Sequence, residues 1–110
     1  MAGTYVLVKT SDGQFLFNLK AENGERILTS ERYVAKAGAL TGIESVRVNA
    51  AHDARYDRRI SRDRKPYFVL KAANDEVIGT SEEYSSAPAM EIGIRSVKTN
   101  APKATVDDRK

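Results

Sequence analysis

The residues of this sequence with the clearest chemical potential form a five-residue motif, Thr-Ser-Glu-x-Tyr, which occurs twice. Two hydroxyls, a carboxylate and a phenol in one small pocket could hold a ligand or a substrate. The copies consist of Thr29, Ser30, Glu31 and Tyr33, and of Thr80, Ser81, Glu82 and Tyr84. The same residue types also suit a turn in which a strand ends, a helix begins and a tyrosine covers the sheet edge. We favour this structural interpretation, and the two clusters remain the first candidate ligand site.

A basic strip between the two motifs is the second candidate. It consists of Arg55, Arg58, Arg59, Arg62, Arg64 and Lys65. With Asp57 and Asp63, the segment 54–67 has six positive and two negative charges, +6 − 2 = +4, against +3 for the whole chain. With Tyr56 and Tyr67 at its ends, it could contact the phosphates and bases of a nucleic acid. Arginine and lysine also protect exposed edge strands from pairing with other chains, and we favour that interpretation.

The sequence contains no motif typical of an enzyme or a metal protein. It has no phosphate-binding loop, no metal-ligand spacing and no nucleophile motif. His52 is the single histidine, and it lacks the partners that a catalytic base or a metal ligand needs. The sequence therefore predicts no catalytic residue, no metal and no cofactor. An enzyme that uses the two clusters is the weakest interpretation.

Length and composition predict one globular domain. The chain has 110 residues, of which 41% are hydrophobic and 30% charged. It has no cysteine, which suits a reducing compartment. The longest apolar run near the N-terminus is only residues 5–8, too short for a signal peptide or a membrane span. We expect a cytoplasmic protein that does not contact membranes.

The two motifs belong to a longer internal repeat. Residues 19–50 align with residues 70–101 without a gap at a spacing of 51, and sixteen of the thirty-two positions are identical. Two repeats, about 1–53 and 54–106, are each marginal alone, so we expect them to share one core. We expect a monomer with an internal pseudo-two-fold axis. We also expect a frayed tail over residues 107–110.

Each repeat begins with three predicted strands. Alternating apolar residues at Phe15, Phe17 and Leu19 predict a strand with one buried face. The next residues predict a three-residue hairpin loop, 22–24, with its glycine left-handed and Leu19 opposite Ile27. The same loop in the second repeat would force Asp75 into the left-handed conformation.

A helix follows the strands in each repeat, over about residues 36–48 in the first. Its predicted core face is formed by Ala39, Ile43 and Val46, and in the second repeat by Met90, Ile94 and Val97. Gly42 and Gly93 lie mid-helix, which predicts close contact between helix and sheet. Ser86 is the expected N-cap, with Pro88 in the first turn, whereas Ala35 offers no cap. Asn49 and Asn100 are expected to end the helices in a left-handed conformation.

The predicted fold class is α+β, from two tandem β-β-β-α-β repeats. The pattern LKA-x-N-x-E-x-I-x-TSE-x-Y, followed by GI-x-SV-x-x-NA, resembles the YegP-like family of bacterial proteins in its tandem-repeat form. The resemblance covers nearly the whole chain, and it departs at Asp75, Gly79 and the arginine-rich connector. It implies one shared, mainly antiparallel sheet with two helices packed on it and with closing strands exchanged between the repeats. It implies no activity.

We therefore interpret the chain as a small, non-catalytic binding or interaction protein. Its partner would be an unknown protein or a small anionic ligand. The alternative is a nucleic-acid-binding accessory protein that uses the basic connector 54–67. Salt-dependent binding to a polynucleotide separates the two interpretations.

Overall fold

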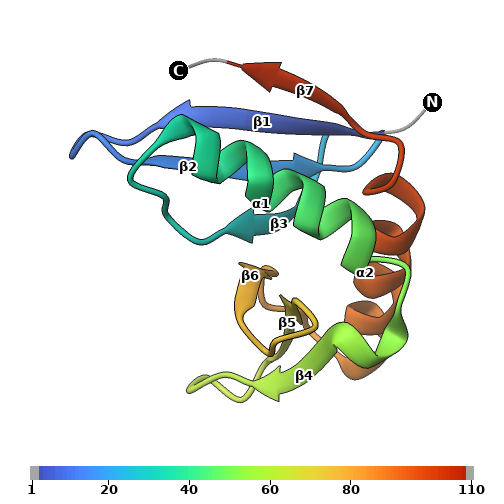
Figure 1. Ribbon diagram of the computed structural model, residues 1–110. Coiled ribbons are helices and arrows are strands. Elements are labelled where there is room, and N and C mark those ends of the chain that lie inside the picture. The colour runs from blue at the N-terminus through green and yellow to red at the C-terminus, as the bar shows by residue number, and fades with distance from the viewer. Residues whose placement is uncertain (1–2, 109–110) are drawn as a thin grey trace.

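The computed structural model describes residues 3–108, and both repeats contribute to a single seven-stranded sheet (Figure 1). The first repeat forms β1 (Thr4–Lys9), β2 (Phe15–Lys20), β3 (Arg26–Ser30) and helix α1 (Lys36–Asn49). After the 3-10 helix η1 (Asp53–Arg55), the second repeat forms β4 (Tyr56–Ile60), β5 (Pro66–Lys71), β6 (Val77–Thr80), α2 (Ala87–Asn100) and β7 (Thr105–Asp108). The strand order is β4-β5-β6-β3-β2-β1-β7.

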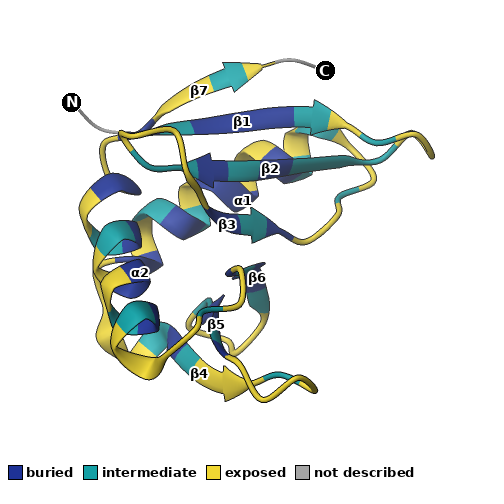
Figure 2. Ribbon diagram, turned by 180° about the vertical axis from the view of Figure 1, so that it is seen from behind, coloured by how far each residue is buried: buried dark blue, intermediate teal, exposed yellow. Residues whose placement is uncertain are grey.

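The two halves of the sheet meet at its centre, where β3 pairs antiparallel with β6 and Thr29 lies opposite Thr80. Both helices pack against the face of the sheet that carries the core side chains. In Figure 2 the β1–β3 half lies in front of α1 and turns its other face toward the viewer. The predicted α+β class and the shared, mainly antiparallel sheet are confirmed.

One strand crosses between the repeats. β7, the closing strand of the second repeat, pairs in parallel with β1 of the first, so the implied strand exchange is present. The corresponding segment of the first repeat, residues 54–57, leads directly into β4. The prediction of a frayed tail over residues 107–110 is wrong for Asp107 and Asp108, which pair with Val6 and Leu7 of β1. Residues 109–110 lie outside the described part of the chain.

The first hairpin has the predicted loop but not the predicted register. Gly24 is left-handed (φ 89°), as expected for a three-residue loop. However, a β-bulge between Leu19 and Lys20 shifts the ladder, so that Leu19 lies opposite Leu28 and not opposite Ile27. A bulge inserts one extra residue into one strand, which a fixed count across the loop cannot include. The second hairpin repeats this arrangement, and Asp75 has the predicted positive φ (71°).

The helix boundaries agree with the predictions except at the C-terminal ends. The Ser86 hydroxyl accepts a hydrogen bond from the Ala89 amide, whereas Ala35, the N-cap residue of α1, provides no side-chain cap. Asn49 and Asn100 are the last residues of their helices and are not left-handed. Each buried asparagine amide donates to the carbonyl four residues earlier, at 2.8 and 2.9 Å, which satisfies it inside the helix.

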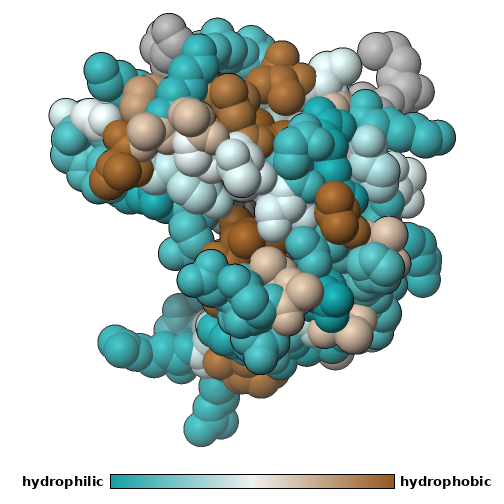
Figure 3. Space-filling model, in the orientation of Figure 1, coloured by the Kyte–Doolittle hydropathy of each residue, from teal (hydrophilic) through white to brown (hydrophobic). Residues whose placement is uncertain are grey.

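The core lies between the sheet and the two helices. Its largest fully buried side chains include Tyr5, Phe17, Phe68, Leu19 and Leu70. On the side shown in Figure 3, exposed hydrophobic atoms form small separate clusters, and the surface is hollowed between the β1–β3 half and the β4–β6 half. The apolar side chains of both repeats thus bury one another in a common core.

Candidate functional site

The serines of the two Thr-Ser-Glu-x-Tyr clusters hold the sheet together. Ser30 and Ser81 are buried, and each hydroxyl accepts the backbone N–H of Phe17 or Phe68 at 2.9 Å. Each then donates to the carbonyl of the following glutamate, at 2.7 and 2.8 Å. Thr29 donates to the Asn18 side chain at 2.8 Å. These hydroxyls are therefore engaged within the fold.

The tyrosines of the clusters pack against the helix glycines. Tyr33 stacks on Phe17 with ring centroids 6.3 Å apart, and Tyr84 stacks on Phe68 at 6.2 Å. A methyl group added at Gly42 would lie 2.7 Å from Tyr33 Cζ, which is too close for van der Waals contact. The glycines thus mark close packing, as predicted, and the nearest partner is the tyrosine ring. Burial raises the pKa of both phenols.

The glutamates of the clusters lie on the surface. Glu31 is exposed, and Glu82 forms an ion pair with Arg26 of the other repeat at 3.0 Å. The members of each cluster thus point in different directions, the serines and tyrosines into the fold and the glutamates out of it. Only Glu82 and Tyr84 of these eight residues line the groove described next.

A groove of about 710 Å³ runs along the first repeat and past the end of β6. Four of its lining residues alternate with buried core residues of β1 and β2, so they lie on the other face of the sheet; they are Val6, Val8, Asn18 and Lys20. The β2–β3 hairpin adds Gly24, Glu25, Arg26 and Ile27, and the second repeat adds Glu82 and Tyr84. The groove thus has apolar side chains beside two cations and two carboxylates.

The second repeat has a different surface at the positions that correspond to this groove. Asp57 and Arg59 replace Val6 and Val8, and their side chains pair at 3.0 Å. Lys71, the counterpart of Lys20, also pairs with Asp57, at 3.4 Å. In the first repeat, Lys20 has a valine in the place of that aspartate. Within residues 3–108, Lys20 has no ion-pair partner.

The basic strip lies at one edge of the sheet, at the end of η1, on β4 and in the turn that follows β4. Three of its arginines are engaged: Arg55 donates to Asn49 at 3.0 Å, Arg58 pairs with Glu91, and Arg59 pairs with Asp57. The others are the exposed turn residues Arg62, Arg64 and Lys65, and the described residues provide no ion pair for them. Half of the strip is therefore engaged within the fold, and two of its six cations are paired with carboxylates.

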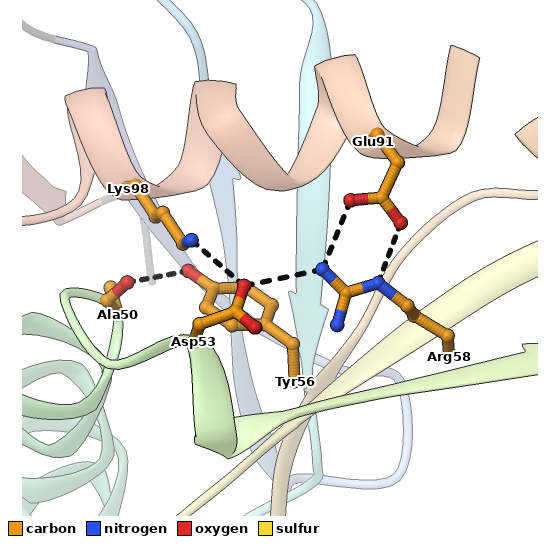
Figure 4. Close-up of polar contacts among 6 residues, drawn as sticks. All are labelled: Ala50, Asp53, Tyr56, Arg58, Glu91 and Lys98. Carbon is orange, nitrogen blue, oxygen red and sulfur yellow. Dashed lines mark hydrogen bonds and ion pairs between the residues drawn. The ribbon is translucent and has the colours of Figure 1, made fainter. Parts of the chain in front are cut away.

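The ion pairs of the strip form a network under α2 (Figure 4). Arg58 binds both carboxylate oxygens of Glu91, at 2.6 and 2.9 Å, and also reaches Asp53 at 3.2 Å. Lys98 donates to the same Asp53 oxygen at 2.9 Å and lies over the Tyr56 ring. The hydrogen bonds from Lys98 and Arg58 lower the pKa of Asp53, and that from Arg58 lowers the pKa of Glu91. The network fixes α2 to β4 and the segment before it.

Fold, repeat and groove together define a small α+β protein built from a tandem duplication. The chain belongs to the family described as Domain of unknown function (DUF1508), which matches residues 10–57 and again residues 61–108. The two matches are 51 residues apart (61 − 10), the same spacing as the internal repeat. The related proteins carry no enzymatic name.

Bacterial relatives match the chain over nearly its whole length. It is 53% identical over 108 residues to a UPF0339 protein of Shewanella oneidensis, covering 98% of each chain. It is 51% identical to the UPF0339 protein YegP of Escherichia coli K12, again covering 98% of each. A solution NMR structure of yegP from E. coli matches with a TM-score of 0.94 at 50% identity, covering 99% of this chain and 94% of that one. The resemblance to the YegP-like family is thus confirmed.

The groove was not among the sites predicted from the sequence. Of its lining residues, Glu82 and Tyr84 were predicted as members of a candidate ligand cluster. Lys20, Arg26, Val6 and Val8 were not predicted as site residues. A signal was nevertheless present in the repeat alignment, because Val6 replaces the acidic Asp57 while the lysine is kept in both repeats. Differences between repeats were therefore more informative here than the shared motif.

Proposed function

We propose that this protein is a non-catalytic binding protein whose groove on the first repeat takes a small amphipathic carboxylate. The observation that carries the proposal is the position of Lys20. Its counterpart Lys71 has Asp57 as counter-ion, whereas Lys20 stands at the rim of the groove without one. A ligand carboxylate would supply the missing negative charge.

The walls of the groove favour a ligand with an apolar body. Val8 is partly exposed, and Val6 and Ile27, which are largely buried, contribute the remaining aliphatic atoms of the wall. Burying apolar surface is the main source of affinity for small ligands. Arg26 stands nearby but already pairs with Glu82, and Glu25 adds a further negative charge. Lys20 is thus the one groove cation without an ion pair among the described residues, and the nearby carboxylates repel further negative charge, so the groove favours a single carboxylate over a multiply charged anion.

Nucleic acid is the less favoured partner. Half of the basic strip is engaged in hydrogen bonds or ion pairs within the fold, which leaves few cations for simultaneous phosphate contacts. We place the protein in the cytoplasm on the basis of its cysteine-free composition. Among residues 3–108, neither helix is long and apolar enough to cross a membrane.

The proposal is tested by titrating the isotopically labelled protein with sodium octanoate and following its amide NMR signals. Octanoate has about ten non-hydrogen atoms, and at roughly 0.3 kcal/mol each the expected binding free energy is about 3 kcal/mol, or millimolar affinity. The amides of Val6, Val8, Lys20 and Ile27 should shift. Inorganic phosphate and 1-octanol, which each lack one half of the ligand, should bind more weakly.

A matched pair of variants provides the control. Lys20→Met should abolish the octanoate shifts, whereas Lys71→Met, at the equivalent position of the second repeat, should retain them. Equal binding by both variants, or shifts that map away from the groove, would remove the basis of the proposal. Equal shifts with 1-octanol would reduce the site to an apolar surface without charge recognition.

A further inference from the structure

The sheet has two outer edges, at β4 and at β7. The four-residue strand β7 covers the edge of the first repeat, whereas the five-residue strand β4 pairs with β5 and has no strand on its other side within residues 3–108. The backbone of β4 therefore faces outward along one side. An open strand edge of this kind can accept another strand.

The outward backbone groups of β4 can be assigned from its partner. Phe68 lies opposite Arg58 and donates its N–H to the Ser81 hydroxyl on the far side of β5. Because residues of an antiparallel ladder alternate in direction, Arg58 and then Ile60 direct their amides and carbonyls away from β5. No backbone partner for these groups exists within residues 3–108.

The corresponding edge in the first repeat, the outer side of β1, is covered by another strand. Leu7 of β1 corresponds to Arg58, and its outward edge is covered by β7, which runs parallel to β1. The Thr105 amide of β7 donates to the Gly3 carbonyl at 3.2 Å. The segment that would play this part for β4 is residues 54–57, and these already lead into β4 itself. The duplication thus provides two strand-accepting edges and only one strand to fill them.

The charges along the open edge indicate what could dock there. Arg62, Arg64 and Lys65 extend from the turn beyond β4 without ion pairs among the described residues, and Arg58 keeps one nitrogen outside its pairs with Glu91 and Asp53 (Figure 4). Ile60 is 66% exposed and presents an apolar side chain beside them. The filling strand of the first repeat is itself acidic, since β7 contains Asp107 and Asp108.

We infer that β4 is a docking edge for an extended acidic segment of another protein, which adds to the sheet as an eighth strand. Backbone hydrogen bonds to Arg58 and Ile60 give the segment its position, acidic side chains face the arginines, and an apolar side chain covers Ile60. A second copy of this chain fits less well, because two β4 edges would place like charges together. This site is separate from the carboxylate groove and does not depend on it.

The test uses two blocked hexapeptides, Glu-Thr-Val-Thr-Glu-Thr and Lys-Thr-Val-Thr-Lys-Thr, in which the charged residues and the valine share one face of the strand, titrated into the labelled full-length protein. The acidic peptide should shift the amides of Arg58 and Ile60 and slow their hydrogen exchange. It should bind about tenfold more tightly than the basic peptide, since its charges complement the edge. The difference should shrink at high salt.

Variants of Ile60 test the edge itself. Ile60→Pro removes an outward amide without breaking the β4–β5 ladder and should abolish binding, whereas Ile60→Thr keeps the amide and should retain it. Should Ile60→Pro disturb the fold, Ile60→Asp keeps the amide and should weaken the acidic peptide by repulsion. Equal binding of both peptides, or binding unaffected by Ile60→Pro and Ile60→Asp, overturns the inference. Concentration-dependent dimerisation through β4, or tighter binding of a single-stranded oligonucleotide to these residues, also overturns it.

Discussion

Gly42 offers a sharp test of how the helices are packed. Alanine is favoured over glycine by about 1 kcal/mol in the interior of a helix, so Gly42→Ala would stabilise the protein if the position were open. It is not open, because the added methyl group would lie 2.7 Å from Tyr33 Cζ and 3.2 Å from Phe17 Cε2. To make room, the Tyr33 ring must leave its stacked position on Phe17.

The expected result is a net loss of stability. Overpacking of this kind costs roughly 1–3 kcal/mol, which exceeds the propensity gain, so we expect Gly42→Ala to lower the free energy of unfolding by about 1 kcal/mol. For a domain of this size the midpoint of thermal unfolding would fall by about 4 °C. Urea denaturation followed by circular dichroism measures the free-energy change directly.

The same helix provides the control. A methyl group at Gly38 would lie 3.4 Å from Tyr33 Cδ1, an ordinary contact, so Gly38→Ala should stabilise the protein by up to about 1 kcal/mol. Adding Tyr33→Phe to Gly42→Ala removes the nearest oxygen and should recover part of the loss. Stabilisation by Gly42→Ala as large as that by Gly38→Ala would show that the helix does not press against Tyr33.

Further predictions concern the second repeat, the sheet centre and pH. Asp75→Gly should stabilise the protein by about 0.5–1 kcal/mol, because φ is 71° there; a loss in urea denaturation would contradict this. Gly79→Ala should cost about 1–3 kcal/mol, since its methyl would lie 2.7 Å from Leu28 Cγ, and the cost should shrink in a Leu28→Ala background; an unchanged cost would argue against this contact. Burial raises the pKa of Tyr5 and Tyr56, so the stability they contribute is complete below pH 10 and lost as the pH rises beyond it; alkaline thermal melts that stay constant would contradict their burial.

Local patterns predicted much of the fold correctly. Alternation placed Phe17 and Leu19 in the core, and the spacing of Ala39, Ile43 and Val46 gave the buried face of α1. These predictions succeed because side-chain direction follows strictly from the periods of strand and helix. The repeat then transferred each assignment to the second half of the chain.

Predictions failed where a single residue alters the local geometry. The bulge beside Ile27 shifts the pairing of Leu19, and no residue type signals it. Asn49 satisfies its amide inside the helix, so it does not need the left-handed conformation common for asparagine at helix ends. Such outcomes depend on tertiary contacts that are absent from the local sequence.

The candidate sites were harder to predict than the fold. Motif analysis emphasised what the two repeats share, and the shared serines and tyrosines proved to be engaged in the fold. The groove and the open edge arise from differences between the repeats, at Val6 against Asp57 and at β1 against β4. Neither site can be recognised from these differences alone, because both depend on the order of the strands in the sheet.

The most direct test of the proposed carboxylate groove is a measurement of nuclear Overhauser effects between octanoate and the methyl groups of the labelled protein. Contacts from the octanoate chain to Val6 and Val8 are expected in the wild type. The contact to Val8 should vanish in Val6→Asp, which gives Lys20 the counter-ion that Lys71 has in the second repeat. Contacts to other methyl groups, or contacts that persist in Val6→Asp, would contradict the account.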